Sequence, residues 1–347
     1  MVDGIEADLR KQSPDPTIEI AEWVSRATLD IIGVAGMGQD FNAIADPNTE
    51  LNHVYRRIFQ PSRAAQILSV LQFFIPPFLL RLLPLQRNSD VHNASKVARD
   101  TSRRLVQAKK VAIAEKKPIT HDIVSVALES GGFTDDQLVD NMMTFLAAGH
   151  ETTASAFTWA MYLLCQNLAV QTKLREEIHA HIPSLGSEIT AQQIDSMPYL
   201  HAVCSETLRF YSPVPITIRD TAVDTTILGD PIPQGTKIIL APWATNYSKE
   251  LWGEDAEVFN PDRWMGPGNA NSGGATSNYA FLTFLHGPRS CIGQKFATAE
   301  FACLIAAFVG RFDFVMRDPD EKIDIKGGIT ARPKNGMHIN LKKVEGW

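Results

Sequence analysis

The first two thirds of the chain have the apolar spacing of α-helices. Thr134 is a favourable N-cap for a helix that begins at Asp135, because its side-chain oxygen can accept from an unpaired backbone N–H. We expect this helix to run to about Cys165, roughly 30 residues or 45 Å, and its apolar character predicts that it crosses the middle of the domain. The same spacing predicts further helices over residues 18–37, 88–117 and 170–181 and after Pro198.

After Pro213 the pattern changes to short alternating runs separated by turn residues. We expect a surface loop over residues 266–277, a helix over residues 290–311, and two or three strands over residues 312–341. The sequence therefore predicts one mainly α, α+β unit with small β-sheets over residues 1–347. The first strands that the sequence predicts after Pro213 are residues 216–219, 225–228 and 237–240.

Composition and charge narrow the class of protein without indicating a chemistry. A hydrophobic share of 44% and a charged share of 21% over 347 residues are those of an ordinary globular protein. The net charge of −6 argues against a general affinity for nucleic acid. The first residues are polar and charged, so they predict neither a signal peptide nor a membrane anchor.

Two apolar stretches raise the question of membrane contact. Residues 142–165 approach the length of a span, but Glu151 and its polar neighbours interrupt them, and a carboxylate in hydrocarbon is costly. Residues 68–85 are dominated by apolar side chains around Pro76 and Pro77. This second stretch fits a buried helix–loop–helix corner and a patch that dips into a bilayer surface equally well. We expect no membrane-spanning helix, and peripheral membrane contact stays one of two interpretations.

The cysteines are Cys165, Cys204, Cys291 and Cys303, and none lies in a C-x-x-C pair. Neither a disulfide framework nor a zinc site is therefore indicated. Buried free thiols are the default expectation for all of them. Cys291 differs because of its neighbours: residues 284–293 are FLHGPRSCIG, which fits the pattern F-x-x-G-x-R-x-C-x-G.

That pattern resembles the cysteine loop of the cytochrome P450 family, in which the cysteine is the thiolate ligand of a haem iron. Gly287 and Gly293 let the backbone turn sharply and approach a flat macrocycle. Cys291 lies just ahead of the predicted C-terminal helix, where unpaired N–H groups and the helix dipole favour a thiolate. Such a ligand pushes electron density onto iron and favours O–O cleavage. The resemblance implies haem b as the cofactor, Cys291 as its metal ligand, Arg289 as a partner of a haem propionate, and Phe284 and both glycines as further cofactor-binding residues.

A second motif lies at the centre of the long helix, where residues 148–153 are AGHETT. It resembles the family's A/G-G-x-D/E-T motif, in which a small residue and a hydroxyl let the helix open locally. The resemblance implies that Thr152 hydrogen-bonds dioxygen and that Glu151 helps to relay protons to it. Without Cys291, the same residues would predict only a kinked core helix.

Glu206 and Arg209 form an E-x-x-R pair on the helix after Pro198, and their spacing puts both charges on one face. Alone, the pair would predict a surface salt bridge of little energetic worth. Residues 259–264, FNPDRW, match the family's F-x-P-x-R-F/W segment, whose arginine joins the pair in a buried network beneath the haem. The resemblance therefore assigns a structural role to Glu206, Arg209 and Arg263.

Weaker matches concern the walls of the site. Arg219 follows this helix on the first predicted strand and resembles an arginine that often reaches a haem propionate. Several other positions would face the substrate side of the haem by the same resemblance, although each fits plain core equally well. They are Phe145, Ala148, Val214, Ile216 and Ile329.

The implied activity is that of a monooxygenase, which inserts one atom of dioxygen into an apolar small organic molecule, here in secondary metabolism. The chain has no glycine-rich dinucleotide or flavin fingerprint. Its electrons would therefore come from NADPH through another protein, NADPH–cytochrome P450 reductase or a similar donor. Two other functions stay open: a haem-thiolate isomerase or dehydratase that needs no reductase, and a non-catalytic remnant. The motif at Glu151 and Thr152 favours the monooxygenase over the first of these.

The resemblance extends from about Ile18 to Leu341, with the motifs in the family's order. One motif is missing: Trp23 is followed by Ala27 at the spacing of the W-x-x-x-R that holds haem propionates. We therefore expect the chain to lack the family's N-terminal anchor and first helices. The family places a full-length form at the cytoplasmic face of the endoplasmic reticulum membrane, and without an anchor we expect the chain itself in the cytoplasm.

Overall fold

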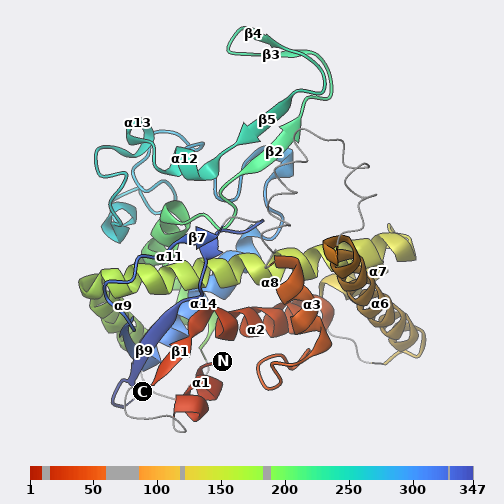
Figure 1. The fold of residues 1–347 in the computed structure, drawn as a ribbon, viewed down its shortest axis with the longest axis horizontal. Coiled ribbons are helices and arrows are strands. Elements are labelled where there is room, and N and C mark those ends of the chain that lie inside the picture. Colours follow the sequence, from red (N-terminus) through yellow and green to blue (C-terminus); the bar gives the residue numbers. More distant parts are fainter. Residues whose placement is uncertain (10–15, 60–85, 118–121, 183–188, 327–328, 347) are drawn as a thin grey trace.

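The computed structural model describes residues 1–9, 16–59, 86–117, 122–182, 189–326 and 329–346. The apolar stretch over residues 68–85 lies outside these ranges, so neither interpretation of it is tested. Figure 1 shows a helix-rich molecule in which one long helix, α8, crosses the middle and the small sheets lie around it.

Helix α8 (Asp135–Gln166) is the central element of the fold. A capping box begins it: the Gln137 N–H donates to Thr134 Oγ1 at 3.3 Å, and the Thr134 N–H donates to Gln137 Oε1 at 2.8 Å. Asp135 and Asp136 in the first turn complement the positive end of the helix dipole. The predicted cap and the predicted long, buried, central helix are confirmed.

Helix α2 (Ile20–Ile32), which continues as a π-helical turn over Gly33–Met37, makes the most extensive helix contact with α8. Gly149 permits this close packing, because a Cβ there would lie 2.9 Å from Ile32 Cδ1. Helix α8 stays continuous through Gly149, so the local opening expected from the sequence is not seen and the small residue serves interhelical packing. The other long helices around α8 are α6 (Gln86–Ala114), α9 (Leu168–His181), α11 (Pro198–Phe210) and α14 (Gln294–Arg311).

Several shorter helices are not predicted by the apolar spacing. Helix α1 (Val2–Leu9) is an example, because it buries Ile5 alone and its other residues show no clear periodicity. One or two helical turns are marginal by themselves, and tertiary packing decides whether they form. The remaining short helices are α3 (Glu50–Phe59), α7 (Ile123–Glu129), α10 (Ala191–Asp195), α12 (Pro242–Asn246) and α13 (Lys249–Trp252), with 3₁₀ turns at Pro261–Trp264 and Gly287–Arg289.

One antiparallel sheet joins the two ends of the chain. Strand β1 (Thr17–Glu19) pairs with β9 (His338–Lys343), which also pairs with β6 (Phe312–Met316). Residues 18 and 19 therefore belong to a strand, and the helix predicted from residue 18 begins at Ile20. Local spacing missed this strand because its partner lies at the other end of the sequence.

The other described strands form two-stranded antiparallel sheets. The turn between β3 and β4 uses left-handed backbone at Leu228 (φ 52°) and Gly229 (φ 94°), which closes a tight hairpin; the strand predicted over residues 225–228 is confirmed as β3, whereas β4 was not predicted. The pairs are β2 (Thr217–Asp220) with β5 (Lys237–Leu240), β3 (Thr225–Ile227) with β4 (Asp230–Ile232), and β7 (Ile325–Lys326) with β8 (Arg332–Pro333).

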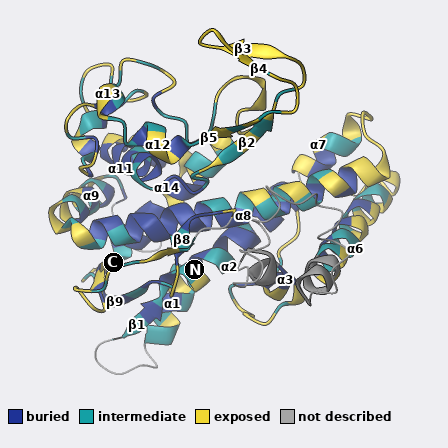
Figure 2. Cartoon of the chain, turned by 45° about the horizontal axis from the view of Figure 1, so that its top comes forward, coloured by how far each residue is buried: buried dark blue, intermediate teal, exposed yellow. Residues whose placement is uncertain are grey.

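The apolar core surrounds α8, where Figure 2 shows the deepest burial, while the β3–β4 hairpin is largely exposed. The larger cluster of buried side chains includes Phe157, Trp252 and Phe301 and unites α8, α11 and α14. A second cluster lies around the first half of α8 and includes Leu29 and Leu146. Within the described ranges, no helix has the length and apolarity needed to cross a membrane.

Candidate active site

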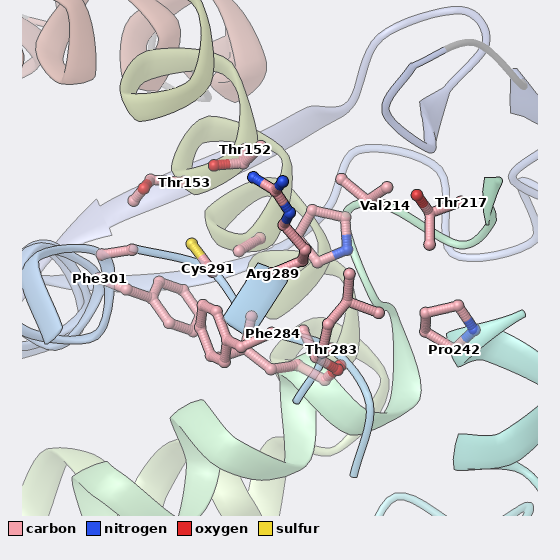
Figure 3. Close-up of a pocket in the computed structure, with 15 residues that line it drawn as sticks. Thr152, Thr153, Val214, Thr217, Pro242, Thr283, Phe284, Arg289, Cys291 and Phe301 are labelled. Carbon is pink, nitrogen blue, oxygen red and sulfur yellow. The ribbon is translucent and has the colours of Figure 1, made fainter. Parts of the chain in front are cut away.

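A cavity of about 210 Å³ lies between α8 and the loop that contains Cys291. Figure 3 shows Cys291, Arg289 and Phe284 from that loop and Thr152 and Thr153 from α8 around this space. Its walls are mainly apolar, which suits a bound group with a large apolar surface. The remaining lining residues are Ala156, Leu208, Pro213, Val214, Thr217, Pro242, Thr283, Leu285, Ala297 and Phe301.

Backbone hydrogen bonds give the cysteine loop a defined shape. The Cys291 N–H donates to the Phe284 carbonyl at 2.9 Å, and the Ser290 N–H donates to the Gly287 carbonyl at 3.0 Å. Gly287 adopts φ 78° in a conformation that residues with a Cβ rarely take, so the turn requires glycine here. The loop therefore presents Cys291 at a fixed position, with an exposed side chain that lines the cavity.

Two features around Cys291 suit an anionic sulfur and an anionic ligand. Helix α14 begins at Gln294, whose N–H donates to the Cys291 carbonyl at 3.4 Å, and no side chain caps this end of the helix, so its positive end lies directly after Cys291. Arg289 is exposed and lines the cavity, and within the described residues no hydrogen bond or ion pair occupies its guanidinium. A thiol, a cation and apolar walls thus share one space.

On α8, the Thr152 hydroxyl lines the cavity and donates to the Ala148 carbonyl at 2.8 Å. Its neighbour Thr153 lines the same cavity and lies beside the buried Glu300 of α14. Burial raises the pKa of Glu300 to about 8, and the Thr153 hydroxyl opposes this rise only in part. The Glu300 carboxyl is therefore mostly protonated at neutral pH.

Glu151 is buried and does not line the cavity that contains Cys291. Its carboxylate pairs with the guanidinium of Arg332 on β8 and accepts from Thr330 Oγ1 at 3.2 Å. It lines a second, polar cavity of about 370 Å³ between α2, α8 and the segment that contains Arg332. Burial, followed by the charge of Arg332, lowers the pKa of His150 to about 3, so the imidazole beside Glu151 is neutral.

The structure brings Glu206, Arg209 and Arg263 together in one buried network. Arg209 binds the carboxylate with two N–H donors at 2.8 Å each, and Arg263 Nε donates to Glu206 Oε1 at 3.1 Å. Neither side chain of the Glu206–Arg209 pair is exposed to solvent. The Trp264 indole N–H and the Asn260 backbone N–H, each at 2.9 Å, complete the carboxylate's contacts. Such full hydrogen bonding is what a buried ion pair requires.

The other predicted site residues lie in different places. Val214 lines the cavity. Arg219 turns back onto its own strand, where Nη1 donates to the Ile218 carbonyl at 2.9 Å and to Thr217 Oγ1 at 3.2 Å. The rest of the predicted pocket residues are not among the described lining of the cavity: Phe145 is half-buried against the second cluster, Ala148 is exposed, and Ile216 and Ile329 are 55% and 65% exposed.

Sequence reasoning missed several residues that form the site. Ala156 lies one helical turn after Thr152, and Ala297 and Phe301 share a face of α14, so helical spacing could have identified these three. No local signal marks Thr217 or Arg332, whose places depend on how distant strands meet α8.

Comparisons with known proteins agree with this geometry. Residues 1–340 match the family model described as Cytochrome P450. The chain is 48% identical to the cytochrome P450 monooxygenase sphH of Aspergillus fumigatus over 345 residues, which cover 97% of this chain and 64% of that protein. It is also 43% identical to the cytochrome P450 monooxygenases ALT8 of Alternaria alternata, with coverage of 95% and 63%, and FUM15 of Gibberella moniliformis, with 97% and 66%. The chain belongs to the cytochrome P450 family, and it spans about two thirds of the length of these relatives.

Proposed function

We propose that this protein is a haem-dependent monooxygenase in which Cys291 is the thiolate ligand of haem b. The observation that carries the proposal is the single cavity that Cys291 and Thr152 line from opposite elements. The residues present fit the cofactor, because a thiol, an unengaged guanidinium at Arg289 and apolar walls match an iron, its propionates and its flat ring.

A bound haem-thiolate would supply the activation of dioxygen and the insertion of one oxygen atom into the substrate, with electrons from NADPH through NADPH–cytochrome P450 reductase or a similar donor. The chain's own contribution is to hold the cofactor and to orient the substrate. The loop from Phe284 to Gly293 holds the sulfur, and Arg289 is placed to bind a propionate. Leu208, Val214 and Phe301 give the same space apolar walls, which favours an apolar substrate.

The proton-handling groups in this proposal belong to α8. The Thr152 hydroxyl can exchange its bond to the Ala148 carbonyl for one to a group in the cavity. Glu151 is next to it in sequence, and Arg332 holds its carboxylate in the polar cavity, so the part of Glu151 in this proposal rests on the resemblance of the motif over residues 148–153. We assign Thr152 and Glu151 the delivery of protons on this basis.

The same resemblance extends the proposal to substrate class and location. We propose an apolar substrate of secondary metabolism and, for a full-length form, the cytoplasmic face of the endoplasmic reticulum membrane. Residues 68–85, the segment that bears on peripheral membrane contact, lie outside the described ranges.

An absorption spectrum of the haem-supplemented, reduced protein with carbon monoxide tests the proposal. We expect the strongly red-shifted Soret band of a thiolate–iron–CO complex in the wild type and its loss in Cys291→Ala. Cys303→Ala is the matched control, because Cys303 is also an exposed free thiol near the loop in sequence, on α14, but does not line the cavity. A band that persists in Cys291→Ala, or none in the wild type, would overturn the proposal.

A further inference from the structure

Asn246 is a fully buried amide at the C-terminal end of the short helix α12. It lies between the Glu206–Arg209 pair on α11 and the segment that leads into the cysteine loop. Buried amides are costly unless their hydrogen-bonding groups are satisfied, so its partners are informative.

Every polar atom of the Asn246 side chain is engaged. Nδ2 donates to the Arg209 carbonyl at 3.1 Å and to Thr283 Oγ1 at 3.0 Å. Oδ1 accepts from the Leu282 N–H at 3.2 Å. The Asn246 carbonyl also accepts from Arg209 Nη1 at 2.7 Å, so the residue contacts both the guanidinium and the backbone of Arg209.

These contacts continue into the cysteine loop. The Thr283 hydroxyl donates to the Leu208 carbonyl at 2.8 Å, which ties the segment to α11 a second time. Phe284 follows directly, and its carbonyl accepts from the Cys291 N–H at 2.9 Å. An unbroken series of hydrogen bonds and single residue steps therefore runs from Arg209 through Asn246 to Cys291.

We propose that Asn246 is a positioning residue that transmits the rigidity of the Glu206–Arg209–Arg263 network to the loop that holds Cys291. The assignment of Cys291 as a haem ligand rests on the proposed function, whereas the mechanical link from Asn246 to the loop stands without it. A carboxamide is needed because one side of the contact offers a donor, Leu282 N–H, and the other an acceptor, the Arg209 carbonyl. Leucine has a similar volume but satisfies neither.

Hydrogen exchange of the haem-free protein tests the link directly. In Asn246→Leu we expect the Cys291 amide to exchange about tenfold faster than in the wild type, while amides in the middle of α8 keep their rates. Thr245→Val is the matched control, because Thr245 precedes Asn246 on α12 and its hydroxyl bonds only within that helix, to the Ala241 carbonyl at 3.3 Å. We expect wild-type exchange at Cys291 in this control.

Thr283→Val keeps the test decisive if Asn246→Leu does not fold. It removes the bond between Thr283 and Asn246 together with the bond from Thr283 to the Leu208 carbonyl, and we expect faster exchange at Cys291 in the same direction. Where both variants fold, their double variant should show less than the sum of the single effects, because the Asn246–Thr283 bond is lost in both single variants. Exchange that rises uniformly over the molecule, or does not change at Cys291, would overturn the proposal.

A second readout uses the haem-loaded protein. Asn246→Leu should shift part of the reduced CO complex from the red-shifted band to the band of protein that has lost thiolate ligation, and Thr245→Val should not. A purely structural residue would lower the unfolding midpoint without changing this ratio in folded protein, and that result would also overturn the proposal. If the wild type lacks the red-shifted band, the proposed function fails, while exchange at Cys291 still decides the role of Asn246.

Discussion

Arg332 on β8 pairs with Glu151 at the centre of α8, and this contact holds the carboxylate in the polar cavity rather than in the one that contains Cys291. Burial lowers the pKa of Arg332 to about 10, and the guanidinium therefore stays charged at neutral pH. The pair thus joins α8 to the C-terminal segment.

Removing this cation should leave a buried carboxylate without its charged partner. We expect Arg332→Gln to lower the free energy of unfolding in urea by about 2–3 kcal/mol, somewhat less than for a fully buried pair because Arg332 is partly exposed. Lys334→Gln, which breaks an exposed pair with Asp324, should cost less than about 1 kcal/mol. Equal losses in free energy of unfolding for the two variants would contradict the interpretation of Arg332–Glu151 as a buried, stabilising ion pair.

The buried network at Glu206 should be the most sensitive charged cluster on α11. Arg209→Met leaves Glu206 without its two closest charged donors, and we expect a loss of about 3–5 kcal/mol or a failure to fold. Lys237→Met, which breaks the exposed Lys237–Asp220 pair, serves as the control and should cost under about 1 kcal/mol. Thermal unfolding of both variants measures the difference, and a mild effect at Arg209 would argue against the structural role.

Glu300 predicts a pH dependence of stability. Its pKa is raised by burial from 4.5 to about 8, so the folded protein keeps a proton that the unfolded chain loses between these values. Stability from this group is therefore greatest at low pH and falls as pH rises through the interval. Between pH 5 and pH 8, we expect the free energy of unfolding of Glu300→Gln to rise relative to that of the wild type, by an amount on the order of a few kcal/mol.

Urea unfolding at several pH values measures this gain. Glu257→Gln, at an exposed position, controls for the loss of one negative charge and should follow the wild-type curve. If the free energies of unfolding of Glu300→Gln and the wild type changed with pH in parallel, the Glu300 carboxyl would not contribute to the pH dependence of stability.

Thr152 predicts an effect on efficiency rather than on folding. In Thr152→Ala we expect the ratio of product formed to NADPH consumed to fall about tenfold, because the cavity-lining hydroxyl to which we assign proton delivery is lost. Thr144→Ala is a matched control, since Thr144 makes the same kind of bond on α8, to the Asp140 carbonyl at 2.9 Å, and does not line the cavity. Full coupling in Thr152→Ala would refute the proton-delivery part of the proposal.

The local pattern of residues was enough to predict those elements whose formation depends on residues close together in the sequence. The Thr134 cap, the long apolar run of α8 and the helix after Pro198 follow from capping and spacing, and these depend on neighbours in the sequence. The cysteine loop was also readable, because its glycines and Cys291 lie within ten residues and their spacing reflects the turn itself.

The remaining features required the folded chain. Strand β1 exists because β9 pairs with it, and Gly149 serves packing against Ile32 rather than a break in α8. Arg332 and Asn246 have no local motif, since their partners lie far away in the sequence.

The sequence by itself was enough to predict the family, from the resemblance of its motifs, and the central helix, from capping and apolar spacing, because both depend on residues close together in the chain. Only the tertiary structure decided which side chains line the cavity with Cys291, that Glu151 pairs with Arg332, and that Asn246 joins α11 to the cysteine loop. The physical reason is that burial and hydrogen-bond partners are properties of contacts between distant segments, and these contacts exist only once the core around α8 has formed.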